Sequence, residues 1–110
     1  GEFEEAIQQL TWVSETAKDL QLRNIALLRM VRIQADQKLF AATEKYMDVL
    51  AQADLQGAEK ANFDYVSGLV ALEETKVDVA QQAFQNVVSN AAAEKNLMGL
   101  AQIQLDDLSK

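Results

Sequence analysis

The stretch 68–87, GLVALEETKVDVAQQAFQNV, decides the fold of this chain. Apolar residues recur every three or four positions on both sides of a short polar interruption, which is the spacing of one face of an α-helix. In the second half, Ala80, Phe84 and Val87 step by four and then three positions. On a helix, the small residue lets a paired helix approach closely, and the larger ones fill the space beside it. Gly68, twelve positions before Ala80, marks the expected crossing point, so the stretch predicts a helical hairpin.

The same step of four and three positions occurs three times along the chain. The triplets are Ala6–Leu10–Val13, Ala42–Tyr46–Val49 and Ala80–Phe84–Val87. They recur at 42 − 6 = 36 and 80 − 42 = 38 residues, and we expect Ala6, Ala42 and Ala80 to be buried at helix crossings. A second match shifted by one residue, Thr43–Met47–Leu50, leaves the phase of the middle copy open. The chain is therefore predicted to consist of repeated helical pairs.

Composition agrees with an all-α fold in one domain spanning residues 1–110. Proline is absent and there are only four glycines, so helices can follow one another through short turns. Six helices are predicted, at about residues 2–17, 20–36, 39–53, 58–74, 77–89 and 92–108. Asp19 is expected to cap the second, and Thr75 with Asp78 resembles a capping box for the fifth. Gly57 should break the chain before the fourth helix, and Ser89-Asn90 should end the fifth and cap the sixth.

The residue inventory excludes several classes of chemistry. There is no histidine, no cysteine and no glycine-rich loop, so a general base, a zinc site and a nucleotide cradle all lack their usual residues. We therefore expect no enzymatic activity, no metal and no cofactor. A net charge of −7 disfavours nucleic acid and anionic lipid as partners. Arg23, Arg29 and Arg32 are expected to form a solvent-facing helix edge, with Asp36 as an intrahelical partner.

These repeated triplets resemble the tetratricopeptide repeat, a helix-turn-helix unit of about 34 residues. Gly68–Ala80–Phe84–Val87 is the best match, and the resemblance covers nearly the whole chain. The tryptophan, the turn glycine and the terminal proline usual in that family are missing here. Hairpins of another solenoid class therefore remain open. The resemblance implies a stack of antiparallel hairpins that binds a protein or peptide partner.

Three segments are similar to a narrower family, the YfgM-like ancillary subunits of the SecYEG translocon. They are Leu28–Arg32 (LRMVR), Gly68–Leu72 (GLVAL) with Ala80 and Phe84, and the closing segment Leu100–Ser109 (LAQIQLDDLS). Proteins of that family have one N-terminal membrane span followed by a periplasmic tetratricopeptide domain. This resemblance implies a location on the periplasmic side of the bacterial inner membrane. It also implies the SecYEG translocon and periplasmic chaperones as partners, with membrane contact only through a span absent from this sequence.

Aligning the second and fourth helices on the repeat predicts a partner-binding groove. The residues turned toward it are Asn24, Leu27, Val31, Gln34, Asn62, Tyr65, Leu69, Leu72 and Glu73. Asparagines, a tyrosine and aliphatic side chains would suit an extended or helical peptide. The competing hypothesis is that the sixth helix, or sequence outside this chain, fills the groove.

Two other functions are also consistent with the sequence. A cytosolic tetratricopeptide adaptor and a regulatory module of a larger enzyme are the alternatives to an envelope protein.

The first helix resembles the second half of a repeat whose first half is absent, so we interpret the chain as a C-terminal fragment. Phe3, Ile7, Leu10 and, if its ring does not pack inward, Trp12 would then be uncovered, which predicts a homodimer through the first helix. Trp12, the only tryptophan, is expected to be a packing residue.

Overall fold

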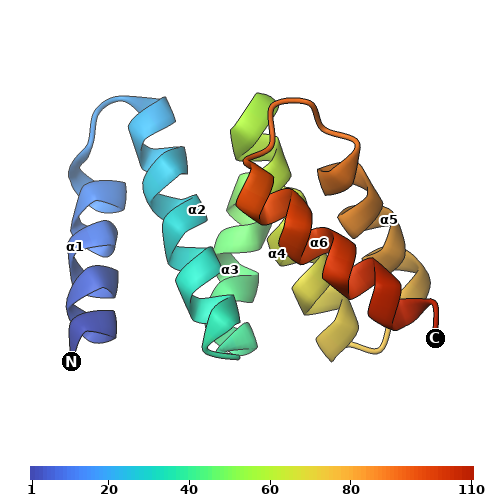
Figure 1. The fold of residues 1–110 in the computed structure, drawn as a ribbon. Coiled ribbons are helices and arrows are strands. Elements are labelled where there is room, and N and C mark those ends of the chain that lie inside the picture. Colours follow the sequence, from blue (N-terminus) through green and yellow to red (C-terminus); the bar gives the residue numbers. More distant parts are fainter. The chain divides into compact units, whose positions relative to one another are not determined.

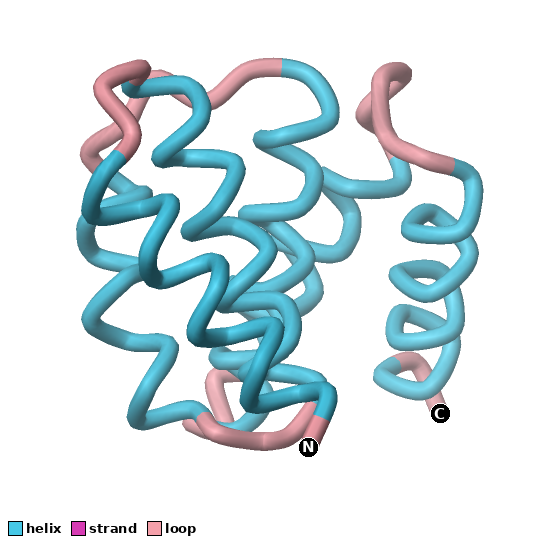
Figure 2. Tube along the Cα trace, turned by 90° about the vertical axis from the view of Figure 1, so that its left-hand side faces the viewer, coloured by secondary structure: helices cyan, strands magenta, loops and turns pink.

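The computed structural model describes all 110 residues, which form six helices and no strand (Figures 1 and 2). The helices are α1 Glu2–Thr16, α2 Leu20–Asp36, α3 Phe40–Ala51, α4 Gly57–Glu73, α5 Val77–Val88 and α6 Lys95–Leu108. The predicted all-α fold is confirmed. Five of the predicted helices begin within one residue of the observed ones, whereas the sixth begins three residues later than expected.

The chain divides into two compact units, each built from three helices. Gly1–Asp54 contains α1, α2 and α3, and α2 packs against both of the others. Leu55–Lys110 contains α4, α5 and α6; α5 packs against both neighbours, and α6 also contacts α4. Within each unit, therefore, helices adjacent in sequence are also adjacent in space (Figure 1).

A left-handed residue closes the turn between α2 and α3. Lys38 has φ 62°, its backbone N–H donates to the carbonyl of Ala35 at 2.9 Å, and that of Leu39 donates to Gln34 at 2.8 Å. These two bonds form a Schellman motif, which satisfies the last carbonyls of a helix and reverses the chain direction. The turn needs no glycine because the bonds hold the lysine in this conformation.

The turn between α4 and α5 repeats this geometry, with Thr75 at φ 61°. The N–H of Thr75 donates to Leu72 at 3.0 Å, and that of Lys76 donates to Ala71 at 2.8 Å. The predicted capping box of Thr75 with Asp78 is wrong: the Thr75 hydroxyl donates to the carbonyl of Glu74, and the N-cap residue of α5 is Lys76. Thr75 thus belongs to the end of α4 and does not start α5.

These turns fix the repeat length at 37 residues. The left-handed residues are 75 − 38 = 37 apart, and α4 begins 57 − 20 = 37 residues after α2. A repeat length of 37 residues aligns Ala80 with Thr43 in the sequence. Thr43 is fully buried, whereas Ala42 is exposed. The expected burial of Ala42 is wrong, and the shifted triplet Thr43–Met47–Leu50 is the correct one. Moving one position along a helix rotates a side chain by about 100°, which is why the two neighbours differ.

The second unit has a core in which α4 and α5 approach closely. Ala80, Phe84 and Val87 are all fully buried, as the triplet predicted. The space beside Gly68 is filled by the ring of Phe84, which also packs edge-on against Tyr65 with 5.7 Å between ring centroids. Gly68 therefore lies at the crossing of this helical pair.

Asp19, Ser89 and Asn90 lie at or beside two of the remaining helix boundaries. The Asp19 carboxylate accepts the N–H groups of Gln21 and Leu22 at 2.8 and 3.4 Å, which confirms it as the N-cap of α2. Ser89 ends α5 as predicted, but Asn90 does not cap α6. The Asn90 side chain accepts a hydrogen bond from the N–H of Ala92 and donates one to the carbonyl of Gly57, both at 2.9 Å. Asn90 instead ties the α5–α6 loop to the first residue of α4.

Candidate protein-interaction surfaces

The first part of the predicted groove lies on α2. Asn24, Leu27, Val31 and Gln34 follow one another at helical spacing, so they share a face of this helix. Val31 is fully buried, Leu27 and Gln34 are buried, and Asn24 is half-buried. The Oε1 atom of Gln34 is buried without a hydrogen-bond partner. Only Asn24 among the four therefore has a substantially accessible side chain.

The second part of the predicted groove lies on α4. Tyr65 is buried, Asn62, Leu69 and Leu72 are half-buried, and Glu73 is exposed. Tyr65 belongs to an apolar cluster that includes Leu97 and Ala101 of α6.

Leu69 and Leu72 pack against the same cluster, so α6 covers part of this face of α4. Within the second unit, this agrees with the competing hypothesis that the sixth helix fills the groove. The predicted site as a whole stays a prediction, and its accessible members are Asn24, Asn62, Leu69, Leu72 and Glu73.

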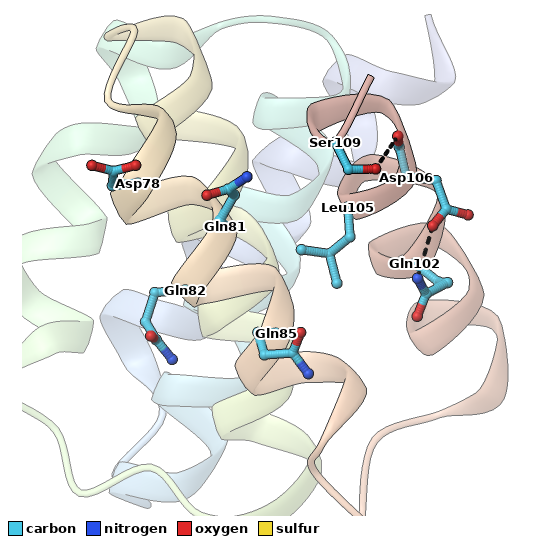
Figure 3. Close-up of a pocket in the computed structure, with 8 residues that line it drawn as sticks. All are labelled: Asp78, Gln81, Gln82, Gln85, Gln102, Leu105, Asp106 and Ser109. Atoms are coloured by element: carbon cyan, nitrogen blue, oxygen red, sulfur yellow. Dashed lines mark hydrogen bonds between the residues drawn. The ribbon is translucent and has the colours of Figure 1, made fainter.

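A polar groove of about 510 Å³ runs between α5 and α6 (Figure 3). One wall comes from α5 and the other from α6, and the lining residues are Asp78, Gln81, Gln82, Gln85, Gln102, Leu105, Asp106 and Ser109. The residues from each helix recur at intervals of three and four, so each wall is one stripe of its helix. Asp78 begins one stripe, and Asp106 lies near the end of the other.

Hydrogen-bond acceptors predominate in this groove. The side-chain amide of Gln102 donates to Asp106 at 3.0 Å, and that of Gln82 donates to Asn86 at 3.0 Å, which leaves both glutamine carbonyls available. No lysine or arginine lines the groove. This groove could not be predicted from the sequence, because its existence depends on which faces of α5 and α6 meet. The signal that points to one of its walls is the spacing of glutamine and aspartate at 78, 81, 82 and 85.

A smaller groove of about 400 Å³ lies beside it and shares two residues with it. It is lined by Asp64, Asp78, Val79, Gln82, Ala83 and Asn86. Asp64 is buried and forms an ion pair with Lys60 one turn earlier in α4. A buried carboxylate is stable only when it is paired, and the partner of Asp64 is Lys60 of the same helix.

The first helix presents a different surface. None of its residues is buried, and Phe3, Ile7 and Leu10 are half-buried. Trp12 is 67% exposed, so its expected role as a packing residue is wrong. Its ring lies on the side of α1 that carries the glutamates, whereas the half-buried apolar residues occupy the other side.

The remaining charged groups behave mostly as surface residues. Arg32 forms an ion pair with Asp36 at 3.4 Å, as predicted, and the guanidinium of Arg23 donates to the carbonyl of Ala17. Arg29 is exposed. No group of three or more histidine, cysteine, aspartate or glutamate side chains is arranged to hold a metal ion. No helix combines the length and the apolar character needed to cross a bilayer.

Comparison with known proteins gives one match. The model of a family described as a tetratricopeptide repeat-like domain matches residues 1–110, which is the whole chain. No curated protein and no solved structure matches the chain. The family agrees with the observed helical pairs.

Proposed function

Because the chain belongs to the tetratricopeptide repeat-like domain family, we propose that residues 1–110 act as one non-catalytic domain that binds other proteins. The observation that carries this proposal is the match over the full length, together with two helical pairs that repeat at 37 residues. Stacked helical pairs create extended surfaces, and proteins of this architecture use such surfaces for recognition.

We further propose that the domain belongs to a membrane-anchored envelope protein on the periplasmic side of the bacterial inner membrane. In that setting it would assist the SecYEG translocon and periplasmic chaperones. The support is the likeness of three segments to YfgM-like proteins. Each of these segments lies within a helix: Leu28–Arg32 within α2, Gly68–Leu72 within α4, and all but the last residue of Leu100–Ser109 within α6.

The partner would contact the accessible residues of the predicted groove. On α2 of the first unit, Asn24 offers its amide group. On α4 of the second unit, Asn62 offers its amide oxygen, since its Nδ2 donates to the carbonyl of Ala58, while Leu69 and Leu72 offer apolar contact and Glu73 offers a charge. The buried members, Val31 and Tyr65 among them, would support this surface from below. Substituting either of those would test stability more than binding, because their side chains lie in the interior.

The test is site-specific photo-crosslinking in bacteria that express the full-length parent protein. A photoreactive amino acid is placed at Asn24, Asn62 or Glu73, and at Asp48 as the control. Asp48 is an exposed residue of α3 outside the predicted groove. We expect adducts with a translocon subunit or a periplasmic chaperone from the three groove positions and none from Asp48.

A charge reversal provides a second measurement. Glu73→Lys should reduce co-purification of the partner, whereas Asp48→Lys, with the same change in charge, should not. Equal adducts from all four positions would mean that the groove is not the contact surface. Adducts only with cytosolic proteins would contradict the envelope assignment and leave the protein-binding role standing.

A further inference from the structure

The exposed side of α1 combines the only tryptophan with an uncompensated negative charge. Trp12 is 67% exposed although tryptophan side chains are usually largely buried. Within its unit, α1 packs against α2 alone, so nothing in that unit covers the outer side of the helix. An exposed indole at a defined place on a rigid helix is suited to contact a partner.

Four glutamates surround this indole. At about 100° per residue, Glu5 lies within about 20° of Trp12 around the helix axis, and Glu15 lies within about 60° on the other side. Glu2 and Glu4 flank the same face near the start of the helix, at about 80° on either side. The helix contains no lysine or arginine. We call these five residues the glutamate–tryptophan face.

Its carboxylates have almost no positive partner within the chain. The only ion pair made by the four glutamates joins Glu4 to the amino group of Gly1 at 3.1 Å. Arg23, in the first turn of α2, donates its guanidinium N–H to the carbonyl of Ala17, which follows the end of α1. The field around Trp12 is therefore negative, and it favours a cation close to the ring.

We propose that the glutamate–tryptophan face binds a basic segment of another protein. An arginine of that segment stacks on the indole, and neighbouring basic side chains pair with Glu5 and Glu15. These two glutamates are ten residues apart, which is about 15 Å along the helix, so about five residues of extended chain would span them. The proposal rests on the proposed function only in that the ligand is a protein, because it concerns a surface outside the predicted groove.

Charge argues against a second copy of this chain as the occupant. Symmetric pairing through the glutamate–tryptophan face would bring two sets of four glutamates into one interface, and like charges at a contact cost binding energy. A basic partner removes that repulsion and uses the same tryptophan. The homodimer expected from Phe3, Ile7 and Leu10 would use the other side of α1 and would leave this face free.

The test uses the fluorescence of Trp12, which has no other tryptophan to obscure it. The probe is a peptide of about twelve residues that carries several arginines, and its counterpart carries glutamates in their place. With the arginine peptide, we expect a saturable shift of the emission to shorter wavelength that weakens with added salt. The glutamate peptide should cause no shift.

Variants separate a specific site from general attraction. Glu5→Gln combined with Glu15→Gln should weaken binding by about tenfold. Glu44→Gln combined with Asp48→Asn removes the same charge from exposed residues of α3, and it should leave binding almost unchanged. Trp12→Ala, measured by calorimetry, should weaken binding by about fivefold without loss of helical signal.

Three results would overturn the proposal. The first is an equal loss of peptide binding in the Glu5/Glu15 double variant and in the Glu44/Asp48 double variant. The second is the absence of an emission shift with the arginine peptide. The third is an emission shift that depends on protein concentration without peptide and accompanies dimerisation in light scattering. The last result would identify a second copy as the occupant. None of these results bears on crosslinking from Asn24, Asn62 or Glu73, so failure here is distinguishable from failure of the proposed function.

Discussion

Gly68 of α4 and Phe84 of α5 are in direct contact, and the contact leaves no room for a methyl group. A Cβ atom at position 68 would lie 2.5 Å from Cε1 and 2.6 Å from Cζ of the Phe84 ring. Carbon atoms that are not bonded normally stay about 3.5–4.0 Å apart. Phe84 is fully buried, so its ring has little space to withdraw. The missing side chain at Gly68 thus sets how closely α4 and α5 approach.

Gly68→Ala should therefore destabilise the protein. Alanine is the better helix former by about 1 kcal/mol, but overpacking a filled core costs about 1–3 kcal/mol, and we expect the clash to dominate. Urea denaturation followed by circular dichroism measures the difference. Adding Phe84→Leu to Gly68→Ala removes the ring from the clash, so the double variant should lose less stability than the two single effects predict together. Additive losses would mean that the two residues do not interact.

Thr75→Gly should stabilise the protein. Thr75 holds a left-handed backbone conformation with φ 61°, which a β-branched residue adopts at a cost. Glycine adopts it freely, although it is also freer in the unfolded chain, so the net gain should be about 0.5–1 kcal/mol. Thermal denaturation should show a rise of about 2–5 °C. Lys38→Gly tests the equivalent turn and should gain less, because lysine is not β-branched. A lower melting temperature for Thr75→Gly would contradict this account of the turn.

Leucine at position 80 should destabilise the protein far more than leucine at position 42. Ala80 is fully buried, so Ala80→Leu overpacks the second unit and should cost about 1–3 kcal/mol. Ala42 is exposed, so Ala42→Leu should change stability by less than about 0.5 kcal/mol. The two variants make the same chemical change, and the difference between their unfolding midpoints tests the 37-residue register. A larger loss of stability for Ala42→Leu than for Ala80→Leu would instead support the triplet Ala42–Tyr46–Val49.

Asp19→Ala should shorten or loosen the start of α2. It removes the acceptor for the N–H groups of Gln21 and Leu22 and should cost about 0.5–2 kcal/mol. Asp19→Asn retains a side-chain oxygen at the same position and should retain most of the stability. Amide hydrogen exchange at Gln21 and Leu22 localises the effect. Unchanged protection of both amides in Asp19→Ala would show that the cap contributes little.

The helices and the hairpin core were predictable because they depend on local spacing. Ala80, Phe84 and Val87 lie on one face at intervals that no other secondary structure buries together, and Asp19 precedes its helix in the usual position of a cap. The exact register of the middle repeat was not predictable. Ala42 and Thr43 are both small, so only the position of the preceding turn decides which of them faces inward.

Other features depend on contacts that the sequence does not display. Thr75 fits a capping pattern, but the end of α4 at Glu73 places it inside a Schellman turn. Trp12 is large and apolar, yet it lies among the glutamates of α1 and points away from the unit's interior. Leu69 and Leu72 occupy the expected face of α4, but that face also receives α6. The polar groove requires the pairing of α5 with α6.

The packing of each helix against its neighbours in sequence has a kinetic consequence. In both units the contacts join segments separated by short loops, so little chain entropy is lost before each contact forms. Helical proteins with such local contacts fold in microseconds to milliseconds. A three-helix unit can therefore form soon after its own residues become available, without waiting for the rest of the chain.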